Sequence, residues 1–85
     1  MPIKIMKEIG YVTDYFSKIE VAAIKLSGPL KVGDKIHIKG HTSDFQQKVE
    51  SMQIRQKPVK EAKKGNEIGI KVKDRVRKND KVFLA

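Results

Sequence analysis

Alternating basic side chains in residues 71–77 have a spacing that suits phosphate binding. The stretch reads Lys-Val-Lys-Asp-Arg-Val-Arg, so its basic residues are Lys71, Lys73, Arg75 and Arg77. If it is extended, these four side chains point to one side at steps of about 6.6–7 Å, while the two valines point to the core. Such steps permit several contacts with the phosphates of a nucleic-acid strand. The alternative is an ordinary solvated strand face, since Lys and Arg also protect sheet edges.

A second basic stretch, residues 55–64, holds five bases and one acid. We interpret it as a loop whose charge contacts phosphates, and the alternative is a polar loop kept soluble by its lysines. Arg55 differs from the lysines because its planar guanidinium can bind phosphate through two hydrogen bonds or stack on a base. The predicted nucleic-acid-binding residues are therefore Arg55, Lys57, Lys60, Lys63, Lys64, Lys71, Lys73, Arg75 and Arg77.

The other reactive side chains form no recognisable catalytic or metal-binding pattern. The chain has no Cys, which excludes thiol catalysis, disulfides and Cys-based metal sites. His37 and His41 have the spacing of a zincin motif, but they fall on an expected strand and turn with no third ligand nearby. The carboxylates mostly adjoin bases, so no isolated pair stands out for acid–base catalysis. We predict no enzyme, no catalytic residue, no metal ion and no cofactor.

The aromatic side chains offer a weak platform for stacking on nucleic-acid bases. We expect Phe16, Phe45 and Phe83 to pack in the core, and Tyr11 or Tyr15 to be the candidates for exposure. Contacts with RNA would then depend on its backbone and shape.

The composition is that of a small basic chain. It has 85 residues, with 19 Lys and Arg against 10 Asp and Glu, and a net charge of +9. This charge favours an anionic partner, most often nucleic acid, although a Lys-rich solvated surface is the alternative. The longest apolar run, residues 21–24, is far too short for a membrane span, and no signal peptide is visible. We expect one domain over residues 1–85, as a cytoplasmic monomer away from membranes.

The distribution of apolar residues predicts strands and almost no helix. Alternation and turn residues place strands at residues 9–15, 19–26, 35–39, 45–54, 67–73 and 81–84. In the second of these the apolar set changes phase, which a bulge or burial on both faces would explain. Six strands without intervening helices predict an all-β fold, a closed six-stranded antiparallel β-barrel.

One turn pattern occurs three times. An apolar residue is followed, three positions later, by a Gly-Asp, Gly-Asn or Asn-Asp pair, at residues 33–34, 65–66 and 79–80. Gly and Asn tolerate a positive φ, and an Asp or Asn side chain bonds to nearby backbone N–H groups. Each such turn is expected to begin a strand.

The same turns carry a resemblance to a known domain. Residues 28–40 read G-P-L-K-V-G-D-K-I-H-I-K-G, which resembles the G-x-L-x-x-G-D-x-[IV]-x-[IV]-x-G signature of domain II in elongation factor Tu-type translational GTPases. Residues 49–54, 61–70 and 76–82 resemble further motifs of that domain, in the same order. The chain is also similar to the C-terminal barrel of U32 peptidase family proteins.

The resemblance to translation factors implies a closed barrel and contact with rRNA or tRNA. GTP binding is not implied, because the chain has no Walker loop. The family's aminoacyl pocket is not retained, since the corresponding positions are Ile9, Gly10, Val12, Arg55 and Glu67.

Three functions follow from this sequence. The first is an RNA-binding module resembling domain II of translation factors. The second is a protein–protein adaptor that packs on a separately encoded enzyme, as the U32-like barrel does, and it predicts an exposed apolar patch near residues 21–24 or 83–84. The third is a stable barrel with incidental charge. Basic residues gathered on one face would favour the first, and an even spread would favour the third.

Overall fold

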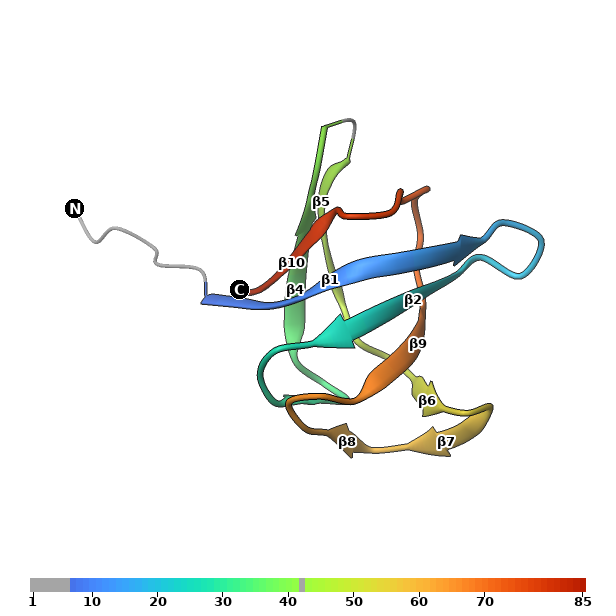
Figure 1. Ribbon diagram of the computed structural model, residues 1–85, viewed down its shortest axis with the longest axis vertical. Coiled ribbons are helices and arrows are strands. Elements are labelled where there is room, and N and C mark those ends of the chain that lie inside the picture. Colours follow the sequence, from blue (N-terminus) through green and yellow to red (C-terminus); the bar gives the residue numbers. More distant parts are fainter. Residues whose placement is uncertain (1–6, 42) are drawn as a thin grey trace.

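A computed structural model describes residues 7–41 and 43–85 as a protein of strands and turns (Figure 1). No helix in these two ranges is long and apolar enough to cross a membrane. The predicted domain of residues 1–85 extends beyond them, so its bounds stay a prediction. The strands are β1 (Lys7–Phe16), β2 (Val21–Leu26), β3 (Leu30–Lys31), β4 (Lys35–Lys39), β5 (Asp44–Lys48), β6 (Met52–Ile54), β7 (Lys57–Val59), β8 (Glu61–Ala62), β9 (Glu67–Lys71) and β10 (Lys81–Leu84).

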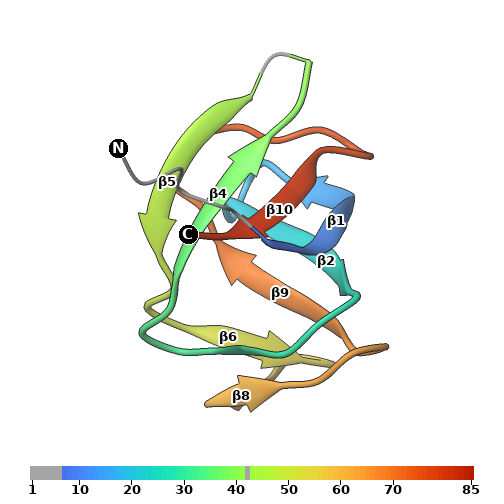
Figure 2. The same ribbon diagram turned by 90° about the vertical axis from the view of Figure 1, so that its left-hand side faces the viewer.

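Eight of these strands form one antiparallel sheet in the order β5-β4-β10-β1-β2-β9-β6-β7, and β3 pairs with β8. The sheet is an open, strongly curled half-barrel (Figure 2). The all-β class is confirmed, but the closed six-stranded barrel is not. The expected strand at residues 45–54 is divided into β5 and β6, and β9 ends at Lys71. Backbone pairing therefore stops at β5 on one side and β7 on the other.

A side chain spans the gap that the strands leave open. Gln47 on β5 donates from Nε2 to the carbonyl oxygen of Lys71 at 2.9 Å, and its Oε1 accepts from the backbone N–H of Lys73 at 3.0 Å. One amide group thus makes the two hydrogen bonds that a neighbouring strand residue would make. The free edge at β7 carries Lys57 and Pro58, which are residues that discourage further strand pairing.

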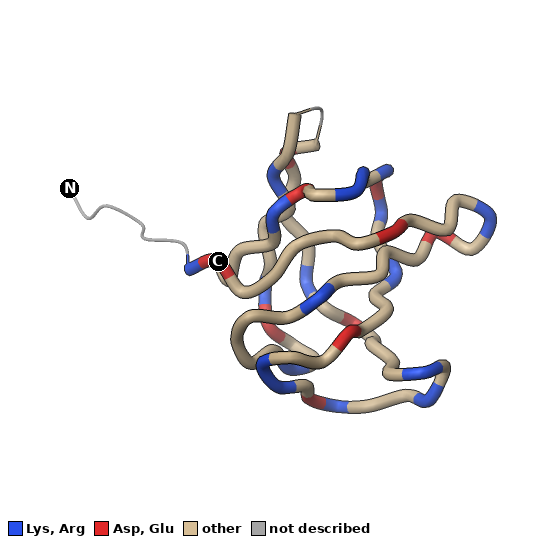
Figure 3. The backbone as a smooth tube through the Cα atoms, viewed as in Figure 1, with Lys and Arg blue, Asp and Glu red and all other residues tan. Residues whose placement is uncertain are grey.

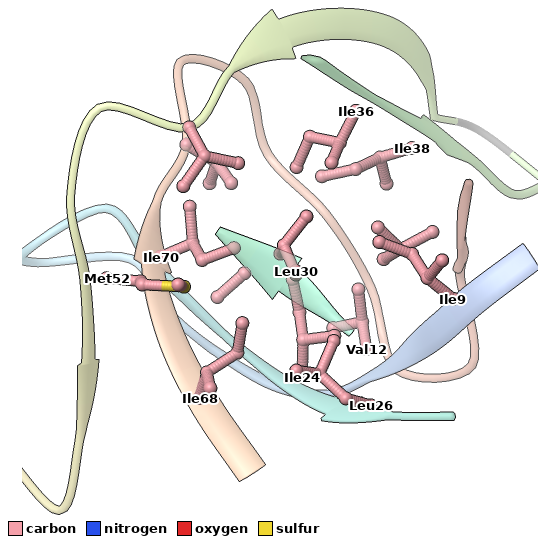
Figure 4. Packing of buried hydrophobic residues seen from close by; sticks show 14 of the residues in the cluster. Ile9, Val12, Ile24, Leu26, Leu30, Ile36, Ile38, Met52, Ile68 and Ile70 are labelled. Carbon is pink, nitrogen blue, oxygen red and sulfur yellow. The ribbon is translucent and has the colours of Figure 1, made fainter. Parts of the chain in front are cut away.

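The core forms because alternate strand residues point to the inside of the curled sheet. In β4, Ile36 and Ile38 are buried between exposed Lys35 and Lys39. Figure 4 shows apolar side chains from several strands pointing to one interior, with Leu30 near its centre. Burying a side chain of this size contributes about 1.5–3 kcal/mol relative to leaving it exposed.

The three repeated turns have the conformation that their residues predict. Each turn consists of four residues, at 31–34, 63–66 and 77–80. The third residue of each turn has a positive φ: 101° at Gly33, 91° at Gly65 and 74° at Asn79. The fourth residue accepts a hydrogen bond from the backbone N–H of the first. These pairs are Asp34 with Lys31 at 3.1 Å, Asn66 with Lys63 at 2.8 Å and Asp80 with Arg77 at 3.0 Å.

The phase change in the second predicted strand arises because Ile19 lies outside the strand and because both faces of β2 carry apolar residues that are at least half-buried. The strand begins at Val21, and Ile19 lies in the preceding turn, where it is 59% exposed. Within β2, Ala22 and Ile24 face the core, while Val21 lies on the outer face and is half-buried. The bulge nearby belongs to β1, where the pairing with β2 shifts between Val12 and Asp14.

Candidate functional site

The two basic stretches lie at opposite ends of the molecule. Residues 55–64 form the β6–β7 turn, β7, β8 and the start of the next turn. Residues 72–80 form the connection between β9 and β10, and both views place this connection at the end away from β7 and β8 (Figures 1 and 2). The structure therefore separates the nine predicted binding residues into two groups.

Neither stretch has the predicted local structure. Residues 55–64 contain two short strands rather than one loop. Residues 72–77 are not a strand, so the regular step between the basic side chains is lost. The alternation of burial is present nonetheless, because Val72 and Val76 are each 2% exposed and the four basic residues between and beside them are exposed.

The basic residues do not gather on one face. Figure 3 shows Lys and Arg at both ends and along the sides of the backbone. Some are countered by acids, as in the 3.6 Å contact between Lys81 Nζ and Glu8 Oε1. This spread lacks the single basic face that the RNA hypothesis predicts. Binding of nucleic acid by the nine individual residues stays a prediction.

A polar groove lies at the opening of the sheet. It encloses about 600 Å³ between the end of β5 and the residues that follow β9. Lys48, Lys71 and Lys73 line it together with Glu20 and Glu50. The charges in this groove are mixed. The Gln47 amide crosses the groove and connects the two edges of the sheet.

A second groove lies on the outer face of the sheet, and we call it the apolar groove. It encloses about 350 Å³. Its apolar lining comes from Phe16, Ile19, Val21 and Ala23, at the β1–β2 turn and the start of β2. Residues 21–24, where an exposed apolar patch was expected, are half-buried or buried. The exposed apolar side chains of the groove are those of Phe16 and Ile19. Phe16, which we expected in the core, is 47% exposed.

The rest of the apolar groove comes from β6, β9 and the β6–β7 turn. Gln53, Arg55 and Gly69 contribute to it. A side chain at Gly69 would lie 3.2 Å from Val21 Cγ1 and 3.3 Å from Gln53 Cγ, so glycine keeps this part of the hollow open. Sequence reasoning selected Arg55 for its charge and overlooked Phe16 and Ile19. The phase change of apolar residues at 19–26 was the signal that could have identified Ile19.

The side chains around His37 have the contacts of a structural cluster. His37 Nε2 contacts Asp44 Oδ1, and Gln46 Nε2 lies 3.3 Å from His37 Nδ1. Ser43 is buried and its hydroxyl donates to the carbonyl oxygen of Arg75 at 3.3 Å. Within residues 7–41 and 43–85, no group of three His, Asp or Glu side chains is placed to hold a metal ion.

Comparisons with known proteins point to peptidases. No protein-family model matches the chain. An uncharacterized protease of Methanocaldococcus jannaschii is 45% identical over 78 residues, which cover 91% of this chain and 19% of the protease. A collagenase of Porphyromonas gingivalis is 40% identical over 77 residues, covering 88% of this chain and 21% of the collagenase. The chain thus spans about a fifth of the length of these curated relatives.

The fold is similar to solved structures of one domain. These are the C-terminal domain of a putative U32 peptidase from Geobacillus thermoleovorans, with a TM-score of 0.87 at 17% identity over 99% of both chains, and its selenomethionine variant, with a TM-score of 0.86 at 18% identity over 91% of this chain and 98% of that one.

These findings correct the expected translation-factor and RNA-binding character. The relatives are named protease and collagenase, and the structural neighbours come from a putative U32 peptidase. The resemblance to domain II of elongation factor Tu is not shown. Of the two resemblances drawn from the repeated turns, the comparisons support the one to the U32 C-terminal domain.

Proposed function

We propose that this chain is a non-catalytic accessory module of a U32-type peptidase and packs on the part that carries catalysis. The observation that supports this most strongly is the share of each protein that matches. Nearly the whole chain aligns with about a fifth of a protease and of a collagenase. Its fold matches a C-terminal domain of a putative U32 peptidase from end to end. Most of each relative, where peptidase chemistry would reside, lies outside this segment.

The side chains of the module favour the same proposal. A hydrolytic nucleophile needs a base within hydrogen-bond reach, oriented by a third group. The Ser43 hydroxyl, close in sequence to the His37 cluster, is directed to the Arg75 carbonyl oxygen instead. The apolar groove, in contrast, offers an exposed hydrophobic surface of the kind that packs on another protein.

Replacement in the P. gingivalis collagenase tests the proposal. One variant deletes its 77 matched residues, and a second substitutes this chain for them. We expect the deletion to reduce collagen cleavage, the substitution to restore it, and the isolated chain to cleave no collagen. Cleavage by the isolated chain would overturn the non-catalytic assignment. A folded substituted enzyme no more active than the deletion would overturn the accessory role.

A further inference from the structure

The apolar groove exposes hydrophobic side chains that lie outside the core. Phe16 and Ile19 are 47% and 59% exposed, and neither belongs to the core or packs against it. Both lie where β1 turns into β2, and this hairpin extends away from the body of the molecule (Figure 1). Apolar side chains gathered at one hollow on the surface mark an interaction site more often than scattered ones do.

The backbone beside this groove is strained. Arg55 and Gln56 have φ values of 51° and 66° and form the two-residue turn between β6 and β7. Such a hairpin turn favours Asn-Gly, because both residues need a positive φ. Strained residues persist where the surrounding structure holds them in place, and they cluster at functional sites. Both residues line the apolar groove, so the strained turn fixes the Arg55 side chain at its margin.

Three basic residues lie in the apolar groove or beside it. Lys18 lies in the turn between Phe16 and Ile19. Lys71 stands opposite Val21 in the pairing of β2 with β9, and residues directly opposite each other share one face of a sheet. Lys18 and Lys71 thus lie beside the groove, and Arg55 lines it.

One acid, Glu67, lines the apolar groove. Glu67 accepts a hydrogen bond from Thr13 Oγ1 at 3.0 Å and stands opposite Lys25 across the strand pair. In and beside the groove the bases Lys18, Arg55 and Lys71 outnumber the acids Glu20 and Glu67. A surface with this positive excess favours negative charge on the partner.

We infer that the apolar groove is the face through which this chain docks on the catalytic part of a U32-type peptidase. The inference rests on the proposed function. It adds which face of this chain contacts the peptidase part and which side chains that part presents to it. The occupant is an apolar side chain of the peptidase part flanked by carboxylates. The apolar group fills the hollow beside Gly69, and the carboxylates meet Arg55 and Lys18.

Solvent labelling of a full-length chimaera tests the inference. The chimaera is the M. jannaschii protease with its 78 matched residues replaced by this chain, and the isolated chain is the reference. An isolated domain is a suitable reference, because the C-terminal domain of the G. thermoleovorans protein has been crystallised on its own. We expect hydroxyl-radical labelling of Phe16 and Ile19 to fall severalfold in the chimaera. Tyr11 and Val32 are the controls, because they are similarly exposed, at 42% and 39%, and lie outside the groove.

The labelling pattern separates failure of the inference from failure of the proposed function. Protection of Tyr11 or Val32 without Phe16 and Ile19 would overturn the groove as the docking face and leave the accessory role standing. Equal labelling of the whole chain in both samples would overturn packing on the peptidase part altogether. Protection of the groove in the isolated chain as its concentration rises would assign the groove to a second copy and also overturn the inference.

Two variants test the apolar and the charged parts of the groove separately. Ile19→Asp should raise the labelling of Phe16 in the chimaera to the level seen in the isolated chain. The matched control Tyr11→Asp should leave Phe16 protected. The double variant Arg55→Asn, Gln56→Gly places residues that favour a positive φ in the β6–β7 turn. It should therefore raise the unfolding temperature of the isolated chain. The same double variant should weaken protection of Phe16. Unchanged protection in both groove variants would overturn the inference.

Discussion

Replacing Gln47 by Ala tests whether one side chain holds the open sheet together. The substitution removes two hydrogen bonds across the gap, of 2.9 and 3.0 Å. Each bond contributes about 0.5–1.5 kcal/mol. Because Gln47 is only half-buried, water replaces part of the loss, and we expect the free energy of unfolding to fall by roughly 1–2 kcal/mol. For a domain of this size, that lowers the unfolding temperature by roughly 4–16 °C.

The assay combines urea unfolding, followed by circular dichroism, with hydrogen exchange at single amides. The backbone N–H of Lys73 donates to Gln47 Oε1, so it should exchange slowly in the native chain and quickly in Gln47→Ala. Gln47→Glu keeps an acceptor for Lys73 and loses the donor to Lys71. It should therefore keep slow exchange at Lys73 with an intermediate stability.

Gln46→Ala is the matched control for the Gln47 variants. It removes the same side chain from the neighbouring position of β5, where the amide lies near His37 instead of across the gap. We expect a smaller loss of stability and unchanged exchange at Lys73. If Lys73 exchanges equally fast in the native chain and in Gln47→Ala, the bridge does not form in solution, and the reasoning about the gap is refuted.

Three further changes test the turns and the core by chemical unfolding. Asp80→Ala leaves the Arg77 N–H without its buried acceptor and should cost about 1–3 kcal/mol, whereas Asp80→Asn keeps an acceptor and should cost less. Asn79→Ala places a β-carbon at a φ of 74° and should cost about 1–2 kcal/mol, with Asn79→Gly close to neutral; equal losses would contradict the role of the positive φ. Leu30→Ala creates a cavity at the centre of the core and should cost about 2–5 kcal/mol.

Local chemistry made much of the fold predictable from the sequence. The strands at residues 35–39 and 81–84 were predicted with the bounds that the structure has, because alternation and a turn pair mark both of them. The three turns were predictable because each depends on two adjacent residues, such as Gly33 and Asp34. Their hydrogen bonds and positive φ values are confirmed.

Closure of the sheet was not predictable in this way. Whether two distant edges meet depends on where pairing stops, and no local pattern marks the end of β9 at Lys71 or the break between β5 and β6. The Gln47 bridge has the same origin, because nothing near residue 47 in the sequence indicates a partner 24 residues away. Long-range geometry decides both.

The candidate site was missed because charge drew attention away from apolar residues. Phe16 reads as a core residue at the end of an alternating strand, and only the tertiary position of the β1–β2 hairpin exposes it. Arg55 was selected for its charge, and it lines the same groove as Phe16. The similarity to proteins named protease, rather than any residue pattern, favours the proposed accessory role over the expected RNA-binding one.

Calorimetric unfolding of the M. jannaschii chimaera beside the isolated chain tests the accessory role most directly. Packing on the peptidase part stabilises the folded chain, because only the folded form makes those contacts. We predict that the chain unfolds at a higher temperature in the chimaera than alone, in one transition with the peptidase part. An independent transition at the temperature of the isolated chain would show that the two parts do not pack, and would contradict the proposed function.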